Sequence, residues 1–284
     1  MLVVRKKQDL QNIIQKQKQL GKKIGFVPTM GYLHEGHLSL MSACKKDSDF
    51  LVVSIFVNPL QFNDPKDFEK YPKDEQRDLQ LCESIGVDLV YLPELDEIYP
   101  EGPLTTVTIK IPHLMNCLCG KSRPGHFEGV LIVLARLFHI LQPDIAYFGK
   151  KDYQQFLIVR EFVKELMFPI EIRGLDTVRE KNGLAMSSRN SRLNPKELEA
   201  ATLLFRSLKI AEEYAQKKNI SIEELIEVIR DVLLSSSLIK IDYISILNPE
   251  TLQPKESLKG KNFIGIAAFV GEVRLIDNHI FEVR

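Results

Sequence analysis

The sequence has 284 residues, with 38 lysines and arginines against 38 aspartates and glutamates, so its formal net charge at pH 7 is zero. A chain of this length can bury a substantial core in one large domain or two modest ones. With 44% hydrophobic and 27% charged residues, the composition excludes a disordered protein. The balanced charge gives no general attraction to nucleic acid or acidic membranes, so any anion site must come from a local cluster.

Neither a membrane span nor a disulfide framework is indicated. The longest apolar stretch, Val130–Leu141, is interrupted by Arg136 and His139 and is shorter than the ~20 apolar residues that a transmembrane helix needs. No long apolar signal core follows Met1, so we expect a cytoplasmic protein. The cysteines do not complete a zinc set and are expected to be reduced and mostly buried: Cys44, Cys82, Cys117 and Cys119.

The first two thirds of the chain alternate between predicted strands and helices. The run Phe50–Val57 (FLVVSIFV) is almost entirely apolar, which is typical of a parallel strand covered on both faces. Strand–helix alternation predicts right-handed crossovers and an α/β fold with a Rossmann-like, doubly wound parallel sheet. The other expected strands are Lys23–Pro28, Asp88–Leu92, Thr105–Ile111, Ile145–Phe148 and Ile170–Gly174, and the expected helices are Gly36–Lys46, Asp74–Ile85, Gly129–Leu141 and Tyr153–Met167.

The pattern changes after about residue 190. Two predicted helices, Pro195–Lys217 and Ile222–Ser235, are followed by two predicted strands, Lys240–Leu247 and Phe263–Leu275. This order predicts a second, smaller α+β domain at the C-terminal end. We therefore expect one domain over residues 1–178 and another over residues 179–284.

The first polar cluster, PTMGYLHEGH at residues 28–37, follows the first predicted strand. Gly31 and Gly36 allow close backbone approach, and the start of a helix exposes unpaired N–H groups and the positive end of its dipole. His34 and His37 lie three residues apart, and their ring N–H groups suit phosphate oxygens. H-E-G-H is one residue shorter than the zinc motif H-E-x-x-H, but a metal site and a simple helix cap remain alternatives.

Three further polar clusters lie after predicted strands or at the domain boundary. Their position matters because ligands of doubly wound sheets bind beyond the carboxyl ends of the strands. The amides of Asn58–Phe62 suit a small polar substrate or simply end a strand. In Gly149–Gln155, a lysine can reach phosphate and an aspartate can accept from ribose hydroxyls, or the segment is a solvated turn with a helix cap. The hydroxyls and arginine of Met186–Asn190 can clamp a polyphosphate or form a polar linker.

Taken together, these clusters resemble the pantothenate synthetase (pantoate–β-alanine ligase) family, among the nucleotidyltransferases that carry an H-x-G-H motif. The chain departs from that family where Lys150 replaces the usual glutamate, Tyr32 the usual alanine and Lys73 the usual arginine. The motifs that carry the resemblance lie in family order: PTMG at 28–31, HEGH at 34–37, SIFVNPLQF at 54–62, RPGHF at 123–127, KDYQQ at 151–155 and MSSR at 186–189.

The resemblance implies an ATP-dependent ligase of pantothenate biosynthesis. It would condense (R)-pantoate with β-alanine through a pantoyl adenylate, releasing AMP and pyrophosphate. The expected pantoate-binding residues are Gln61, Gln155, Asn58 and Met30. The residues expected to bind ATP, with Mg²⁺ on its phosphates, are Met30, Gly31, His34, His37, Gly149, Lys151, Asp152, Val178, Met186, Ser187, Ser188 and Arg189.

The resemblance also implies roles and partners. The expected catalytic residues, which stabilise phosphate charge, are His34, His37, Lys151 and Arg189. His37 would either give a proton to the leaving pyrophosphate or only donate a hydrogen bond. No side chain is assigned as a metal ligand. Asp78 either contacts a hydrated metal or is simply a solvated carboxylate on a helix. A homodimer is expected, with no nucleic-acid or membrane partner, and the C-terminal domain is expected to close as a lid hinged at residues 176–185.

Three alternatives remain at this point. Another H-x-G-H nucleotidyltransferase would make a dinucleotide product, whereas ligation releases free AMP. A zinc hydrolase built on His34 and His37 would carry stoichiometric zinc. A noncatalytic nucleotide-binding module would bind ATP without turnover.

Overall fold

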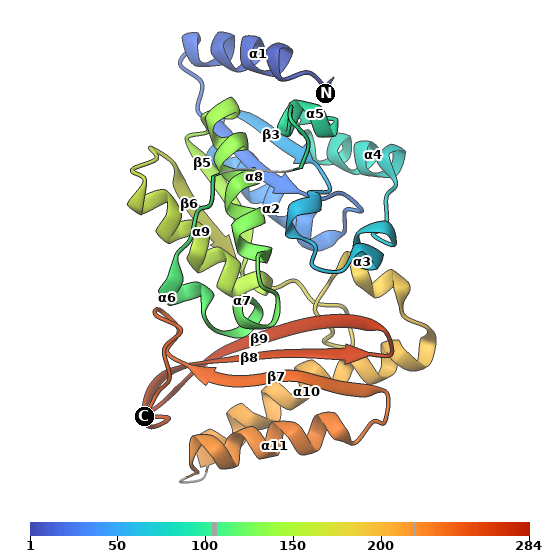
Figure 1. Ribbon diagram of the computed structural model, residues 1–284, viewed down its shortest axis with the longest axis vertical. Coiled ribbons are helices and arrows are strands. Elements are labelled where there is room, and N and C mark those ends of the chain that lie inside the picture. The colour runs from blue at the N-terminus through green and yellow to red at the C-terminus, as the bar shows by residue number, and fades with distance from the viewer. Residues whose placement is uncertain (104–106, 218–219) are drawn as a thin grey trace. The chain divides into compact units, whose positions relative to one another are not determined.

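A computed structural model of the protein describes residues 1–103, 107–217 and 220–284 (Figure 1). These residues form two compact units. Unit 1 comprises Met1–Ile111, Arg123–Lys150 and Ile158–Asp176, and unit 2 comprises Pro112–Ser122, Lys151–Leu157 and Thr177–Arg284.

Unit 1 is built on a six-stranded sheet, all of whose pairings are parallel, in the order β1-β4-β3-β2-β5-β6. This arrangement confirms the predicted doubly wound α/β fold. Because β2 lies between β3 and β5, the carboxyl ends of these three strands are neighbours, where such sheets bind ligands. The strands are β1 (Leu2–Val4), β2 (Ile24–Thr29), β3 (Phe50–Ile55), β4 (Leu89–Tyr91), β5 (Ile145–Gly149) and β6 (Glu171–Leu175).

Helices cover both faces of this sheet (Figure 1). On one face, Met41 of α2 and Cys82 of α4 pack with Val27 of β2. On the other face, Phe26 meets Phe138 of α8 edge to face, with ring centroids 6.2 Å apart. The helical segments are α1 (Lys7–Gln19), α2 (Glu35–Asp47), η1 (Pro59–Gln61), α3 (Pro65–Glu69), α4 (Glu75–Ile85), α5 (Leu95–Ile98), α8 (His126–Leu141), η2 (Lys150–Asp152) and α9 (Tyr153–Glu165), the last two of which cross the boundary between the units.

Unit 2 contains an antiparallel sheet in the order β7-β8-β9, which confirms the smaller α+β part. Its two long helices lie along one face of this sheet, where Leu204 and Leu225 are buried with Ile266 of β8 (Figure 1, orange to red). The elements are α6 (Pro112–Met115), α7 (Leu118–Ser122), η3 (Ser188–Arg192), α10 (Pro195–Lys217), α11 (Ile222–Leu234), β7 (Ile239–Leu247), β8 (Gly260–Val270) and β9 (Val273–Val283).

Two predicted strands differ from the structure. The range predicted as one strand, Phe263–Leu275, belongs to two, because Gly271, with a φ of 57°, turns the chain into a tight hairpin between β8 and β9. Residues 105 and 106 of the strand predicted over Thr105–Ile111 lie outside the described residues, and its remainder, 107–111, forms no strand. The sheet edge next to β4 is occupied instead by β1, which the sequence did not predict, like α1 after it.

The four cysteines are free thiols. Burial raises the pKa of Cys44 to about 11 and that of Cys82 to about 12. Across the described ranges, none of the helices is both long and apolar enough to cross a membrane.

Replacing Gly129 of α8 should destabilise unit 1, because a Cβ there would overlap the carbonyl of Leu60 at η1. For Gly129→Ala we expect a loss of about 1–3 kcal/mol in the free energy of unfolding, measured in urea. The exposed His139 on the same helix provides the control, since His139→Ala should change that free energy by no more than about 0.5 kcal/mol. Equal stabilities of the two variants would contradict a tight contact between α8 and η1.

Candidate active site

His34 and His37 lie at the N-terminus of α2, directly beyond the carboxyl end of β2. His34 is the N-cap residue, and its Nδ1 accepts a hydrogen bond from the backbone N–H of Gly36 at 3.2 Å. The backbone N–H of His34 in turn donates to Nδ1 of His37 at 3.3 Å, and the ring centroids are 4.1 Å apart. Because Nδ1 accepts in both rings, each neutral imidazole carries its proton on Nε2. The pair therefore caps the helix and presents two Nε2–H donors.

The loop before these histidines is held by Asp78 of α4. Its two carboxylate oxygens accept from the backbone N–H groups of Tyr32 and Leu33, both at 2.7 Å. Gly31 and Tyr32 have left-handed φ values of 78° and 47°, a conformation that is costly for tyrosine. A side chain at Gly31 would have its Cβ 2.9 Å from an Asp78 oxygen, so glycine is needed for this close approach.

Asp78 is not a solvated helix carboxylate, which corrects one of the two readings of the sequence. The residue is only 1% exposed. Burial raises its pKa, and the two backbone N–H groups act in the opposite direction. The preceding residue, Arg77, donates to the backbone carbonyl of Leu33 at 2.9 Å. Two adjacent residues of α4 therefore bind the backbone N–H and the backbone carbonyl of Leu33.

Gln61 of η1 lies beyond the carboxyl end of β3, and Asn58 orients its amide. The Nδ2 of Asn58 donates to Oε1 of Gln61 at 3.1 Å and to the carbonyl of Gly129 at 3.0 Å. Its Oδ1 accepts from the hydroxyl of Tyr99 at 2.8 Å. Because Oε1 of Gln61 accepts, its Nε2 is the donor end, and this Nε2 lies 2.8 Å from the sulfur of Met30. Three predicted residues, Met30, Asn58 and Gln61, are thus brought together.

The backbone of Gln61 is held by the Arg-Pro-Gly-His-Phe segment before and within α8. Nδ1 of His126 lies 2.7 Å from the Gln61 carbonyl, to which Arg123 also donates at 3.1 Å. A carbonyl can only accept, so His126 carries its proton on Nδ1, and its Nε2 accepts from Arg123 at 3.1 Å. The sequence indicated this segment as a family motif but assigned it no role. Tyr99 carried no signal in the sequence.

Gly149, the last of the predicted residues in unit 1, ends β5, where an added Cβ would meet no atom within 4 Å. The neighbouring Lys150 makes an ion pair with Asp176 at 2.8 Å. The remaining predicted residues belong to unit 2.

Two adjacent glutamines at the start of α9 have different environments. Gln154 is buried, and its Nε2 donates to the carbonyls of Leu114 and Cys117 at 2.8 and 2.9 Å. It therefore holds the α6–α7 segment. Gln155, the residue predicted to bind substrate, is half-buried, as is Lys151 in the preceding turn.

The Val178–Arg189 segment of unit 2 forms a narrow hairpin followed by η3. The backbone N–H of Met186 donates to the carbonyl of Val178 at 3.0 Å, so these two predicted residues lie opposite each other. Ser187 caps η3, and its hydroxyl accepts from the backbone N–H of Arg189 at 3.2 Å. Ser188 is buried.

The hydrogen bonds predict opposite tautomers within one protein. In nitrogen-15 NMR spectra at neutral pH, His34 and His37 should show the Nε2–H tautomer, because their Nδ1 atoms accept backbone N–H groups. His126 should show the Nδ1–H tautomer and serves as the internal comparison. Nδ1–H signals from His34 or His37 would contradict the capping arrangement.

Comparison with known proteins finds relatives that match almost the whole chain. The family model described as pantoate-beta-alanine ligase matches residues 2–280. The pantothenate synthetase of Leptospira interrogans (strain 56601) is 55% identical over 98% of this chain and 97% of that protein. The pantothenate synthetase of Thermoanaerobacter sp. (strain X514) is 51% identical over 98% of both chains.

Solved structures give the same result. The crystal structure of pantothenate synthetase from Thermus thermophilus has a TM-score of 0.91 and 42% identity, and covers 98% of this chain and 99% of that one. Pantoate-beta-alanine ligase from Francisella tularensis, complexed with beta-gamma ATP and beta-alanine, has a TM-score of 0.83 and 38% identity, covering 99% and 97%. The chain therefore belongs to the pantoate–β-alanine ligase family.

Proposed function

We propose that the protein condenses (R)-pantoate with β-alanine in two steps at the residues described above. An oxygen of the pantoate carboxylate attacks the α-phosphorus of ATP, and the bond to the leaving pyrophosphate breaks. The amine of β-alanine then attacks the acyl carbon of the pantoyl adenylate, loses a proton and displaces AMP. The observation that carries this proposal is the pair of Nε2–H donors at a helix N-terminus beyond β2, together with the oriented Gln61 amide beyond the neighbouring strand β3.

His34 and His37 would act as neutral hydrogen-bond donors to phosphate oxygens. Their Nδ1 atoms are engaged by backbone N–H groups, so a protonated ring would lose its bond in the loop. A neutral imidazole can still polarise an oxygen through its N–H group. This arrangement favours donation of a hydrogen bond by His37 over transfer of a proton to the leaving pyrophosphate.

Fixed positive charge would come from Lys151 and Arg189, which are catalytic in this proposal. Phosphoryl transfer needs positioning and charge stabilisation more than a protein nucleophile. The other ATP-binding residues would supply backbone and hydroxyl contacts: Met30, Gly31, Gly149, Asp152, Val178, Met186, Ser187 and Ser188.

Pantoate would contact Gln61 and Gln155, whose amides match hydroxyl and carboxylate groups. Nε2 of Gln61 is the donor end, which suits a carboxylate or hydroxyl oxygen of the substrate near Met30. Asn58 would take part by orienting Gln61, since its own amide bonds Gln61, Gly129 and Tyr99.

We assign Mg²⁺ to the nucleotide and not to a cage of protein ligands. Within the part of the chain that the structure describes, no three His, Cys, Asp or Glu side chains are grouped to hold a metal ion. Mg²⁺ would therefore be bound mainly by the phosphates of ATP and by water, as is common at nucleotide sites. We also propose a cytoplasmic homodimer, on the basis of the family resemblance.

The adenylate route is tested by pantoate-dependent exchange of labelled pyrophosphate into ATP. The wild type should catalyse this exchange without β-alanine and release free AMP once β-alanine is added. Free AMP also excludes transfer of the nucleotide to another phosphate. A folded preparation that makes pantothenate but shows no exchange would overturn the adenylate intermediate.

His37→Ala should slow the exchange about 10²–10³-fold, the usual effect of removing one donor to developing charge. His139→Ala provides the control, because His139 is exposed on α8. Exchange by His37→Ala at the rate of His139→Ala would remove His37 from the mechanism.

Lys151→Met should also slow the exchange about 10²-fold or more, because a fixed charge at the phosphates is lost. Lys150→Met is the matched control: the neighbouring ammonium group pairs with Asp176 instead. Steady-state kinetics with varied ATP measure both variants. Similar kinetics for Lys151→Met and the wild type would contradict the role of Lys151.

A further inference from the structure

The ATP-binding residues proposed in unit 2 lie on two segments that are far apart in sequence. One is the turn that carries Lys151, and the other is Val178–Arg189. Neither segment lies within a sheet: the Lys151 turn is 3-10 helix, and Val178–Arg189 combines an isolated bridge, a turn and 3-10 helix with irregular backbone. Their relative position therefore depends in part on contacts made elsewhere in the unit.

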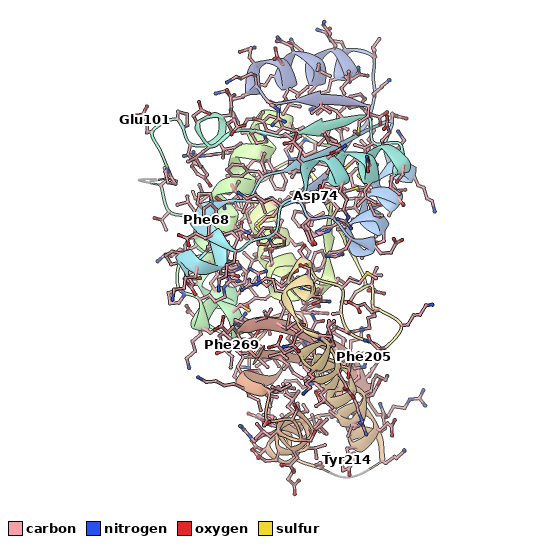
Figure 2. All side chains as sticks on the ribbon, turned by 90° about the vertical axis from the view of Figure 1, so that its right-hand side faces the viewer. Phe68, Asp74, Glu101, Phe205, Tyr214 and Phe269 are labelled. Atoms are coloured by element: carbon pink, nitrogen blue, oxygen red, sulfur yellow. The ribbon has the colours of Figure 1, made fainter. Side chains whose placement is uncertain are left out.

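The Val178–Met186 hairpin is anchored by Arg179. This residue forms an isolated antiparallel bridge with Ala185, and its guanidinium donates to the carbonyl of Gly183 at 3.1 Å. The guanidinium also stacks on the ring of Phe205, 3.8 Å from its centroid. Phe205 is labelled in Figure 2 and belongs to α10, so Arg179 links the hairpin to that helix.

Arg179 is in turn held by Asp277 of β9. The two side chains form a bidentate pair, with nitrogen–oxygen distances of 2.7 and 2.9 Å. The side chain of Asp277 is 1% exposed and that of Arg179 18%. Bidentate pairing fixes geometry as well as charge, and breaking a buried pair leaves an uncompensated charge. Asp277 therefore determines where Arg179, and with it the hairpin, can lie.

Asn278, the next residue of β9, binds the other segment. Its Nδ2 donates to the backbone carbonyl of Lys151 at 2.7 Å. Its own backbone N–H donates to Oδ1 of Asp277, also at 2.7 Å. Both residues are in register with β8, Asp277 opposite Ile266 and Asn278 opposite Gly265. Two adjacent residues on a paired strand thus bind both segments.

We propose that Asp277 and Asn278 are positioning residues for the adenylate-forming step. They set the spacing between the Lys151 turn and the Val178–Arg189 segment without touching substrate. The proposal rests on the assignment of these two segments to ATP. It adds β9, which carries none of the family motifs quoted above, to the machinery of the reaction.

Asn278→Ala tests the bond to Lys151, and Asn262→Ala is its matched control. Asn262 of β8 also donates from Nδ2 to main-chain carbonyls, those of Leu258 and Gly260. Asn278→Ala should reduce kcat/KM for ATP about five- to tenfold, the effect of one lost hydrogen bond, with pantoate KM changed no more than about twofold. Asn262→Ala should lower Tm and leave both KM values unchanged.

Asp277→Asn tests the ion pair, and Asp242→Asn is its control. Asp242 of β7 pairs with Arg274 at 2.7 Å in the same sheet, with side chains 22% and 18% exposed. Both variants should lower Tm, but only Asp277→Asn should reduce kcat/KM for ATP. Equal kinetic effects, or a lower Tm with unchanged kinetics in Asp277→Asn and Asn278→Ala, would show a purely structural role and overturn the proposal.

Lys151→Met in the same assays separates the two levels of inference. If it impairs ATP use while Asn278→Ala does not, the assignment of Lys151 stands and positioning by Asn278 is wrong. If Lys151→Met is also without effect, the assignment fails and the positioning role of β9 falls with it.

Discussion

The buried carboxylate of Asp78 is the contact on which the geometry of the histidine loop depends. Gly31 and Tyr32 take left-handed backbone conformations in succession, and tyrosine adopts this conformation only where its surroundings offset the cost. Asp78 does so by accepting from two consecutive backbone N–H groups. His34 then starts α2 at a fixed point, and the capping bonds orient both rings.

Gln61 is held in a similar way. In our proposal its amide contacts substrate, and the residues that orient the amide do not contact substrate. Asn58 determines which end of the Gln61 amide donates, and His126 with Arg123 holds its carbonyl. In unit 2, Asp277 and Asn278 bind backbone and side chain of other segments in a comparable way. Such supporting contacts keep reacting groups in place and reduce the reorganisation needed during the reaction.

Much of the fold could be predicted from the sequence, because β2, β3 and β5 are mostly apolar runs separated by segments with a helical pattern. The β8–β9 hairpin could not be predicted, since its turn, Gly271 and Glu272, is only two residues long within a largely apolar stretch. The residue types at His34 and His37 indicate phosphate chemistry, but their tautomers depend on which atoms the backbone reaches. Asp78 lies in a charged helix, where only the tertiary contacts distinguish a buried carboxylate from a solvated one.

In our proposal, the capping bonds also divide the binding of a polyphosphate between two kinds of side chain. A protonated imidazole would add positive charge but would lose the acceptor that the loop requires. The histidines therefore contribute direction and leave charge to lysine and arginine side chains, which stay cationic throughout the neutral range. Under this division, an imidazole that is fixed as a helix cap serves to aim a hydrogen bond, and the two tasks of aiming and charge neutralisation fall to different parts of the chain.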